Sequence, residues 1–193
     1  SLLIATFIFI SSCSTNEPQK NVALKQDSLH LTYDSIVRSN KLYLSDCKKL
    51  FAEAKKMDSI LLKEMEVKND VANKAIKAFT DFAFYCSNDT LCPIYLIKTA
   101  QLAQSINNIP QAKVVLDKCV DQYPKSVHHP AALFLLAQLY DEPTYLNNEV
   151  EAKRIYEKII AEYPKSDWAK SSKGALSFIG KSDAQIMEQL KKK

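Results

Sequence analysis

Residues 111–126 read QAKVVLDKCVDQYPKS, and residues 151–166 read EAKRIYEKIIAEYPKS. The two segments align without a gap at an offset of forty residues, and they share an alanine, two lysines and the whole Tyr-Pro-Lys-Ser tail. Self-similarity at this period predicts a helical solenoid, because one helical hairpin cannot bury its apolar face alone and has to stack on another. We therefore expect a fold that offers surfaces for binding rather than a catalytic centre.

A third, degenerate copy precedes the two clear ones. A shift of 37 residues towards the N-terminus reaches side chains of similar size and polarity. The aligned positions are Ala75, Phe79, Phe82 and Ala83 in the early copy, and Ala112, Leu116, Cys119 and Val120 in the next. The preceding helices agree at the same offset, since residues 93–102 align with residues 130–139. The sequence therefore predicts about three helical hairpins.

The spacing within each copy resembles that of the tetratricopeptide repeat. Ala112 precedes Pro124 by twelve residues, and Ala152 precedes Pro164 by twelve. In that motif small residues let two helices approach closely, large residues fill the neighbouring groove, and proline limits a helix at the turn. The resemblance covers roughly residues 71–180, although the copies run 37 and 40 residues where about 34 is usual. It implies an all-α solenoid of helical hairpins.

Further helices are expected on both sides of the repeats. The segments 26–40 and 41–68 are each predicted to form a helix, and together they make an N-terminal extension over residues 26–70. A heptad-like apolar stripe runs along the longer one through Tyr43, Cys47, Leu50, Ala54, Met57 and Leu61. Two readings stay open, because this stripe either docks on the first repeat or pairs with a second copy of the chain. With a short terminal helix in residues 181–193, about nine helices are predicted.

The first 13 residues form a segment that is distinct from the rest of the chain. Residues 2–10 (LLIATFIFI) are too few for a membrane-spanning helix, which needs about 20 residues, but they suit the apolar part of a signal peptide. The run ends in Ile10-Ser11-Ser12-Cys13, which resembles a bacterial lipobox. The resemblance implies that residues 1–13 are a lipoprotein signal peptide with its lipobox, and that lipid is attached to Cys13. The polar residues 14–25 are then expected to form a flexible tether.

Repeats with such junctions behind a lipobox are similar to those of bacterial envelope lipoproteins. These include the BamD-type barrel-assembly proteins and the repeat proteins of the Tol-Pal system. The resemblance implies a lipid-anchored scaffold or adaptor of the outer membrane that faces the periplasm and binds envelope or outer-membrane proteins. Two narrower functions stay open: a subunit of outer-membrane protein assembly, and a regulator of cell-wall maintenance that self-associates through residues 41–68.

The first helix of each hairpin is expected, by the same resemblance, to line a binding groove. The residues assigned to this groove are Ile97, Gln101, Gln104, Phe134, Gln138 and Asp141. Most are apolar or neutral, whereas a groove that binds an acidic peptide terminus needs cationic donors. We therefore expect the groove to take a helix or an extended segment of another protein. The alternative is that the N-terminal helices fill part of it.

Composition and motifs do not favour catalysis, a metal or another cofactor. Two glycines in 193 residues disfavour a phosphate-binding loop, and the net charge of +4 is too mild and too evenly interspersed to indicate nucleic-acid binding. His128 and His129 are adjacent, without metal-ligand spacing, and are expected in a surface loop. Cys86 and Cys92 flank a short turn, so they are expected either to form a disulfide or to remain buried thiols.

Overall fold

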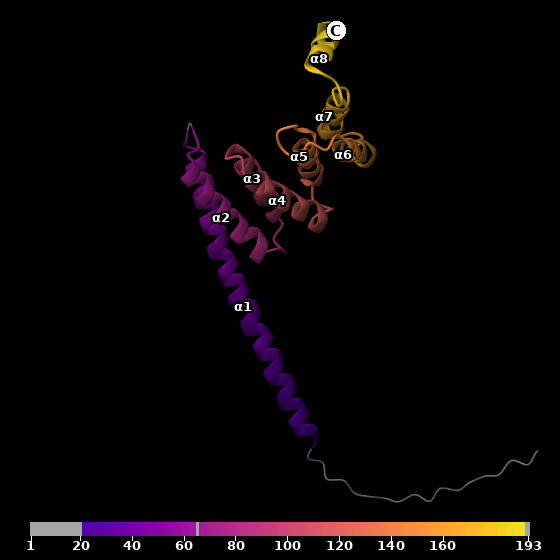
Figure 1. Ribbon diagram of the computed structural model, residues 1–193. Coiled ribbons are helices and arrows are strands. Elements are labelled where there is room, and N and C mark those ends of the chain that lie inside the picture. The colour runs from indigo at the N-terminus through magenta and orange to yellow at the C-terminus, as the bar shows by residue number, and fades with distance from the viewer. Residues whose placement is uncertain (1–20, 65, 192–193) are drawn as a thin grey trace, which may run out of the picture. The chain divides into compact units, whose positions relative to one another are not determined.

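The computed structural model describes residues 21–64 and 66–191, which are helical apart from short connections (Figure 1). Eight helices lie in this part of the chain: α1 (Asn21–Leu61), α2 (Asn69–Tyr85), α3 (Cys92–Ser105), α4 (Ile109–Gln122), α5 (His129–Asp141), α6 (Glu149–Glu162), α7 (Asp167–Leu176) and α8 (Asp183–Lys191). Contacts separate residues 1–44 from a compact unit of residues 45–193. None of the described helices is long and apolar enough to cross a bilayer. The predicted signal peptide and Cys13 lie outside the described residues.

Within the compact unit, the helices from α2 to α7 each pack on the next one along the chain. Contacts join α2 to α3 and continue stepwise to α7, while α3 also contacts α5 and α5 contacts α7. One continuous core runs through these helices. The alanines at the repeat positions are all fully buried, as close helix approach requires: Ala75, Ala100, Ala112, Ala137 and Ala152. The packing confirms the predicted all-α solenoid of helical hairpins.

The N-terminal extension differs from the prediction in its boundaries. The segments 26–40 and 41–68 were expected to be two helices, but α1 is continuous from Asn21 to Leu61. It also includes residues 21–25, which were assigned to the tether. No proline or glycine interrupts this segment, so nothing in its backbone ends the helix midway. This merger explains why eight helices are found in the described residues where nine were expected.

The apolar stripe of α1 docks on the first repeat. Ala54 and Met57 belong to the buried core. The ring centroid of Phe51 lies 5.2 Å from that of Phe82 in α2 and 6.1 Å from that of Tyr95 in α3. Of the two readings of the stripe, docking is therefore the one that the structure shows for this half of the helix. These side chains are not available for pairing with a second copy.

An asparagine pair sets the start of α4 and of α6. Asn107 and Asn147 have positive φ angles of 58° and 47°, a region that asparagine enters more readily than most residues. The side-chain oxygens of Asn108 and Asn148 then accept hydrogen bonds from backbone N–H groups three residues on, at 3.3 and 3.1 Å. This pair recurs at the same offset of forty residues as the tail, but it was not among the features predicted from the sequence.

The tyrosine of the repeated tail ties the end of each clear hairpin to its start. Tyr123 and Tyr163 directly follow α4 and α6, with nearly identical backbone dihedrals. The Tyr123 hydroxyl donates to the carbonyl oxygen of Ser87 over 2.8 Å, just before α3. The Tyr163 hydroxyl lies 2.6 Å from Nδ1 of His129, the first residue of α5. The tyrosine of the repeated tail therefore marks the end of a helix and also links the end of its hairpin to the start.

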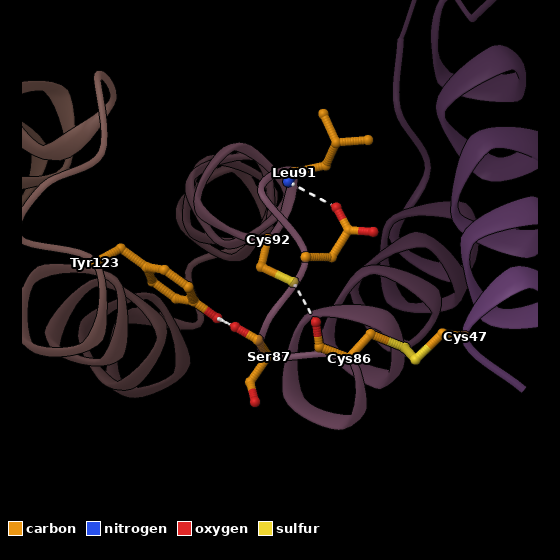
Figure 2. The surroundings of a disulfide bond; sticks show 7 residues. Cys47, Cys86, Ser87, Leu91, Cys92 and Tyr123 are labelled. Atoms are coloured by element: carbon orange, nitrogen blue, oxygen red, sulfur yellow. Dashed lines mark hydrogen bonds between the residues drawn. A yellow bond between two sulfur atoms is a disulfide. The ribbon is translucent and has the colours of Figure 1, made fainter. Parts of the chain in front are cut away.

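In the first hairpin, Cys86 takes the position of this tyrosine (Figure 2). Its side chain forms a disulfide with Cys47 of α1, with the two Cα atoms 5.6 Å apart. The predicted pairing of Cys86 with Cys92 is therefore wrong. The short turn brings the Cys92 thiol to the backbone of Cys86, where it donates to the carbonyl oxygen over 3.1 Å, while the Cys86 sulfur points to α1. The disulfide thus ties the first hairpin together, as the tyrosines tie the later ones.

The C-terminal helices begin at serine caps. The Ser166 side chain accepts a hydrogen bond from the backbone N–H of Ala169 over 3.1 Å at the start of α7. At the start of α8, Ser182 and Gln185 exchange hydrogen bonds in the reciprocal pattern of a capping box. Gly180 between the two helices has a φ of 71°, which a glycine adopts without strain. α8 thus lies in residues 181–193, where a short terminal helix was expected.

Candidate functional site

An apolar groove of about 730 Å³ lies between α2 and α4, beside the C-terminal half of α1. Its lining comprises Leu50, Thr80, Asp81, Phe84, Tyr85, Gln111, Val114 and Val115. Three of its apolar side chains are strongly exposed: 46% of Phe84, 48% of Tyr85 and 58% of Val114. A hollow with exposed aromatic and aliphatic walls is typical of a surface that binds another molecule.

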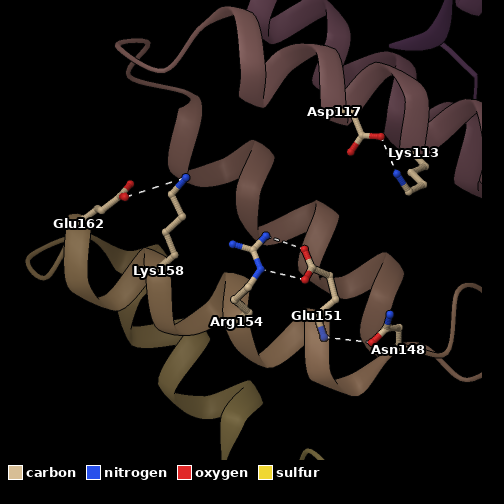
Figure 3. A network of polar contacts seen from close by, with 7 residues as sticks. All are labelled: Lys113, Asp117, Asn148, Glu151, Arg154, Lys158 and Glu162. Carbon is tan, nitrogen blue, oxygen red and sulfur yellow. Dashed lines mark hydrogen bonds and ion pairs between the residues drawn. The ribbon is translucent and has the colours of Figure 1, made fainter.

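The equivalent surface between α4 and α6, one repeat further along the chain, carries polar side chains. At the repeat offset of 37 residues Phe84 aligns with Asp121, and at the offset of 40 Val114 aligns with Arg154. Both of these polar residues are exposed. Arg154 donates two hydrogen bonds to Glu151, at 2.8 and 2.5 Å (Figure 3). Hydrogen bonding to Arg154 also lowers the pKa of the Glu151 carboxyl. Since both places have the same helical framework, the fold does not require apolar residues in the groove.

The rim of the apolar groove keeps one positive charge without an acidic partner. Asp81 is neutralised by Lys77 at 2.5 Å. Lys118 of α4 lies instead over the ring of Phe84, with its Nζ 4.4 Å from the ring centroid, and forms no ion pair with a described residue. A cation held by the face of an aromatic ring stays able to attract a carboxylate. The groove therefore suits an apolar segment that carries an acidic side chain.

The six residues predicted to line a groove do not share one surface. Gln101 and Gln138 are exposed, at equivalent positions of α3 and α5. Ile97 is buried in the core, with 5% of its surface exposed. The prediction is wrong for this residue, because a helix inside the stack has neighbours on several sides and leaves only a narrow strip exposed.

Phe134 and Asp141 are half-buried and contact neighbouring helices. The ring of Phe134 lies 5.5 Å from that of Tyr156 in α6 and 5.2 Å from that of Trp168 in α7. The Asp141 carboxylate accepts from the Tyr156 hydroxyl over 3.5 Å, and burial raises the pKa of this carboxyl. Gln104, at the position equivalent to Asp141, is half-buried. These side chains contribute to the stack, while Gln101 and Gln138 are the exposed members of the predicted set.

The end of α1 covers part of the exposed strip on α3. Asp58 of α1 forms an ion pair with Lys98 of α3 at 2.5 Å. Around this pair lies a second hollow of about 590 Å³, whose walls include Leu61, Leu62 and Gln101. The end of α1 therefore contacts α3 at this end of the stack and leaves a hollow open beside the contact.

In the described part of the chain, two cysteines lie outside the disulfide, and both are buried thiols. Burial raises the pKa of Cys92, and it raises the pKa of Cys119 to about 12. A thiol held protonated in this way is a weak nucleophile and metal ligand. Among the described residues, no group of three or more His, Cys, Asp or Glu side chains is placed to hold a metal ion.

His129 is buried and does not lie in a surface loop as predicted. Only 3% of it is exposed, because the turn before α5 carries the residue into the helix start, against Tyr163. Burial lowers the pKa of the imidazole below its ordinary value of 6.5, and Lys158 acts in the same direction. Glu162 and a hydrogen bond with the backbone of Val120 act against them. The structure thus holds this histidine neutral.

The free energy of unfolding is expected to fall as the pH is lowered from 7.5 to 5. The unfolded chain protonates His129 near pH 6.5, before the folded chain does, so its contribution is complete above that pH and is lost as the pH falls through the lower folded pKa. Urea unfolding at several pH values measures this slope. His129→Gln should flatten it and His128→Gln should not; equal slopes in all three chains would contradict the assignment.

Comparison with protein families agrees with this architecture. A family model described as tetratricopeptide repeat matches residues 95–126 and 131–166. These ranges cover most of α3 to α6 and end on the two serines of the repeated tail. No curated protein and no solved structure was found to match the chain. These two segments are therefore similar to tetratricopeptide repeats, a solenoid class that offers surfaces for protein partners.

Proposed function

We propose that this chain is a lipid-anchored scaffold of the bacterial envelope that binds other proteins, with the apolar groove as its main docking surface. The observation that carries the docking site is the contrast of Phe84 and Val114 with Asp121 and Arg154 at equivalent positions. Exposed aromatic and aliphatic side chains in a hollow anchor protein partners. Because the next hairpin has polar residues at the equivalent positions, the stability of the fold does not by itself explain the exposed apolar residues Phe84 and Val114.

Two observations support a place in the envelope. The sequence ending at Cys13 resembles a lipobox, and several acyl chains, each contributing ~0.8 kcal/mol per buried CH₂, anchor a protein stably. The disulfide between Cys47 and Cys86 suits an oxidising compartment such as the periplasm, because disulfides are rare in the cytosol. We place the anchor in the outer membrane and the repeats in the periplasm.

The partner is inferred from the chemistry of the groove. Its apolar walls fit a helical or extended protein segment with apolar side chains, and the cation of Lys118 fits a carboxylate on that segment. The two narrower functions differ in which protein contains the segment that binds the groove. Outer-membrane assembly predicts a β-barrel protein, and cell-wall maintenance predicts a component of wall synthesis.

Site-specific photo-crosslinking tests the docking surface in the cell that makes the protein. A photoreactive phenylalanine is placed at Val114 in one chain and at Arg154, the equivalent position, in another. We expect one recurrent envelope protein attached at Val114 and a much weaker product at Arg154. Equal products at both positions, or no product at Val114, would refute the groove as the docking surface.

Replacing the apolar walls by the residues of the next hairpin is expected to abolish docking. The variant Phe84→Asp, Tyr85→Gln, Val114→Arg copies side chains that the same framework already accepts. Because anchors in a groove each contribute about 2 kcal/mol, we expect at least about tenfold less partner recovered. The control is Asp121→Ala, Gln122→Ala on the polar side, and circular dichroism checks that both variants fold. Unchanged recovery would contradict the proposal.

The anchor has a test that is independent of the groove. Radiolabelled fatty acid should enter the wild-type chain and not Cys13→Ala, and only the wild type should stay with outer-membrane fractions after a salt wash. Label in both chains, or in neither, would refute the lipid anchor and leave the docking surface to stand by its own experiment.

A further inference from the structure

All of the net charge of the chain lies at one end. The last 29 residues contain seven lysines and three acidic residues. The chain has 26 basic and 22 acidic residues in total, so the first 164 residues contain nineteen of each. The even interspersion of charge expected from the composition therefore holds only before residue 165. A sign asymmetry of this kind indicates an interaction surface.

Five of these seven lysines lie in the part of the chain that the structure describes, and all five are exposed. The exposed lysines of this region are Lys165, Lys170, Lys173, Lys181 and Lys191, which we call the C-terminal lysines. Within the described chain none of them forms an ion pair, and Lys181 donates only to the Ser177 carbonyl oxygen and the Gln189 side chain. Several lysines in the repeats are paired instead, although Lys118 and Lys125 form no ion pair with a described residue. The pairs are Lys74 with Asp70, Lys77 with Asp81, Lys113 with Asp117, Lys153 with Glu157 and Lys158 with Glu162.

Apolar side chains are exposed among the C-terminal lysines. Trp168 lies between Lys165 and Lys170 in sequence and is 36% exposed, while its ring also contacts Phe134 at 5.2 Å. Met187 of α8 is 55% exposed. Tryptophan with one side on protein and one side accessible suits the headgroup level of a membrane. Lysines beside such residues are typical of helices that lie on a lipid surface.

The use of lysine and not arginine in this region favours binding of a lipid surface over binding of a single phosphate or carboxylate group. The chain has only two arginines, Arg38 and Arg154, and neither is in this region. Arginine offers a planar fork for bidentate binding of one phosphate or carboxylate, whereas lysine is a mobile point charge. Several unpaired lysines spread over α7, α8 and the turns before them fit a surface where negative charge is spread as well. We propose that α7 and α8 bind the anionic headgroups of a phospholipid membrane.

Vesicle binding tests this inference without the acyl anchor. Every chain carries Cys13→Ala so that no lipid can be attached, and is mixed with vesicles of phosphatidylcholine alone or with added phosphatidylglycerol. We expect sedimentation with the phosphatidylglycerol vesicles only, and weaker binding as salt is raised, because salt screens exposed charges. The single tryptophan, Trp168, reports the place of contact, and its fluorescence should shift to the blue on binding.

Matched variants decide whether the C-terminal lysines are responsible. Lys165→Gln, Lys170→Gln, Lys173→Gln should lower partitioning to phosphatidylglycerol vesicles by about tenfold or more. The control, Lys74→Gln, Lys77→Gln, Lys153→Gln, removes the same charge from paired positions and should bind as before.

Three results would overturn the inference. One is equal binding of both triple variants. Another is sedimentation without a change at Trp168, which would assign binding to a different part of the chain. The third is binding to polyglutamate or DNA but not to vesicles, which would assign the lysines to another anionic partner. None of these results bears on the apolar groove or on lipidation of Cys13, so this inference and the proposed function fail separately.

Discussion

Removing the disulfide between Cys47 and Cys86 is expected to lower the free energy of unfolding by about 4 kcal/mol, since it closes a loop between residues 39 apart. Cys47→Ala, Cys86→Ala removes the cross-link without leaving an unpaired thiol from this pair. Urea unfolding should show this loss, and a reductant should produce a similar loss in the wild type. The reductant should have no effect on the double variant, because its two buried cysteines are already thiols.

Peptide mapping checks the pairing directly. Trypsin releases residues 42–48, which contain Cys47, and residues 78–98, which contain both Cys86 and Cys92. The observed pairing links these two peptides, and fragmentation of the longer one should place the bond on Cys86. A free 42–48 peptide with an internal loop in 78–98 would instead restore the pairing expected from the sequence. A reductant that leaves the stability of the wild type unchanged would contradict the predicted contribution.

Phe82→Ala is expected to destabilise the chain by about 3–5 kcal/mol, the usual range for deleting a buried aromatic ring. Phe82 is fully buried where α1, α2 and α3 meet. Its ring lies 5.2 Å from that of Phe51 and 5.4 Å from that of Tyr95, so its removal also breaks two aromatic contacts. Urea unfolding measures the change, with an unaltered dependence on denaturant showing that the unfolded state is the same.

Phe84 provides the matched control for Phe82. It is the same residue type two positions along the same helix, but it is 46% exposed in the apolar groove. Phe84→Ala should cost less than about 1 kcal/mol, in the range of surface substitutions. Equal losses from Phe82→Ala and Phe84→Ala would contradict the observed burial of α2, and with it the position of the groove.

The repeat could be predicted from the sequence because it depends on the size and spacing of side chains that lie close together in the chain. Close helix packing needs a small side chain, so Ala112 and Ala152 mark the same place twice, and both are fully buried. The asparagine pair before α4 was equally visible at Asn107 and Asn108, but it required the alignment to be extended upstream. The exposed ring of Phe84 also had a signal, since its aligned partner is Asp121.

Other features required the packed structure. Ile97 and Gln101 lie one helical turn apart, and no spacing rule tells which of them a neighbouring helix covers. The partner of Cys86 depended on the direction in which its side chain leaves α2, since Cys92 is closer in sequence but Cys47 lies where the sulfur points. His129 was likewise placed by a turn whose course the sequence does not give.

By itself the sequence determined the helical period, the stacking of hairpins and the excess of charge after residue 164, because these follow from side-chain size, spacing and sign along the chain. Only the tertiary structure decided which apolar residues stay exposed, which cysteines meet and which lysines lack a partner. Each of those outcomes depends on distances between side chains far apart in sequence, such as Cys47 with Cys86 or Asp58 with Lys98, and packing alone sets them.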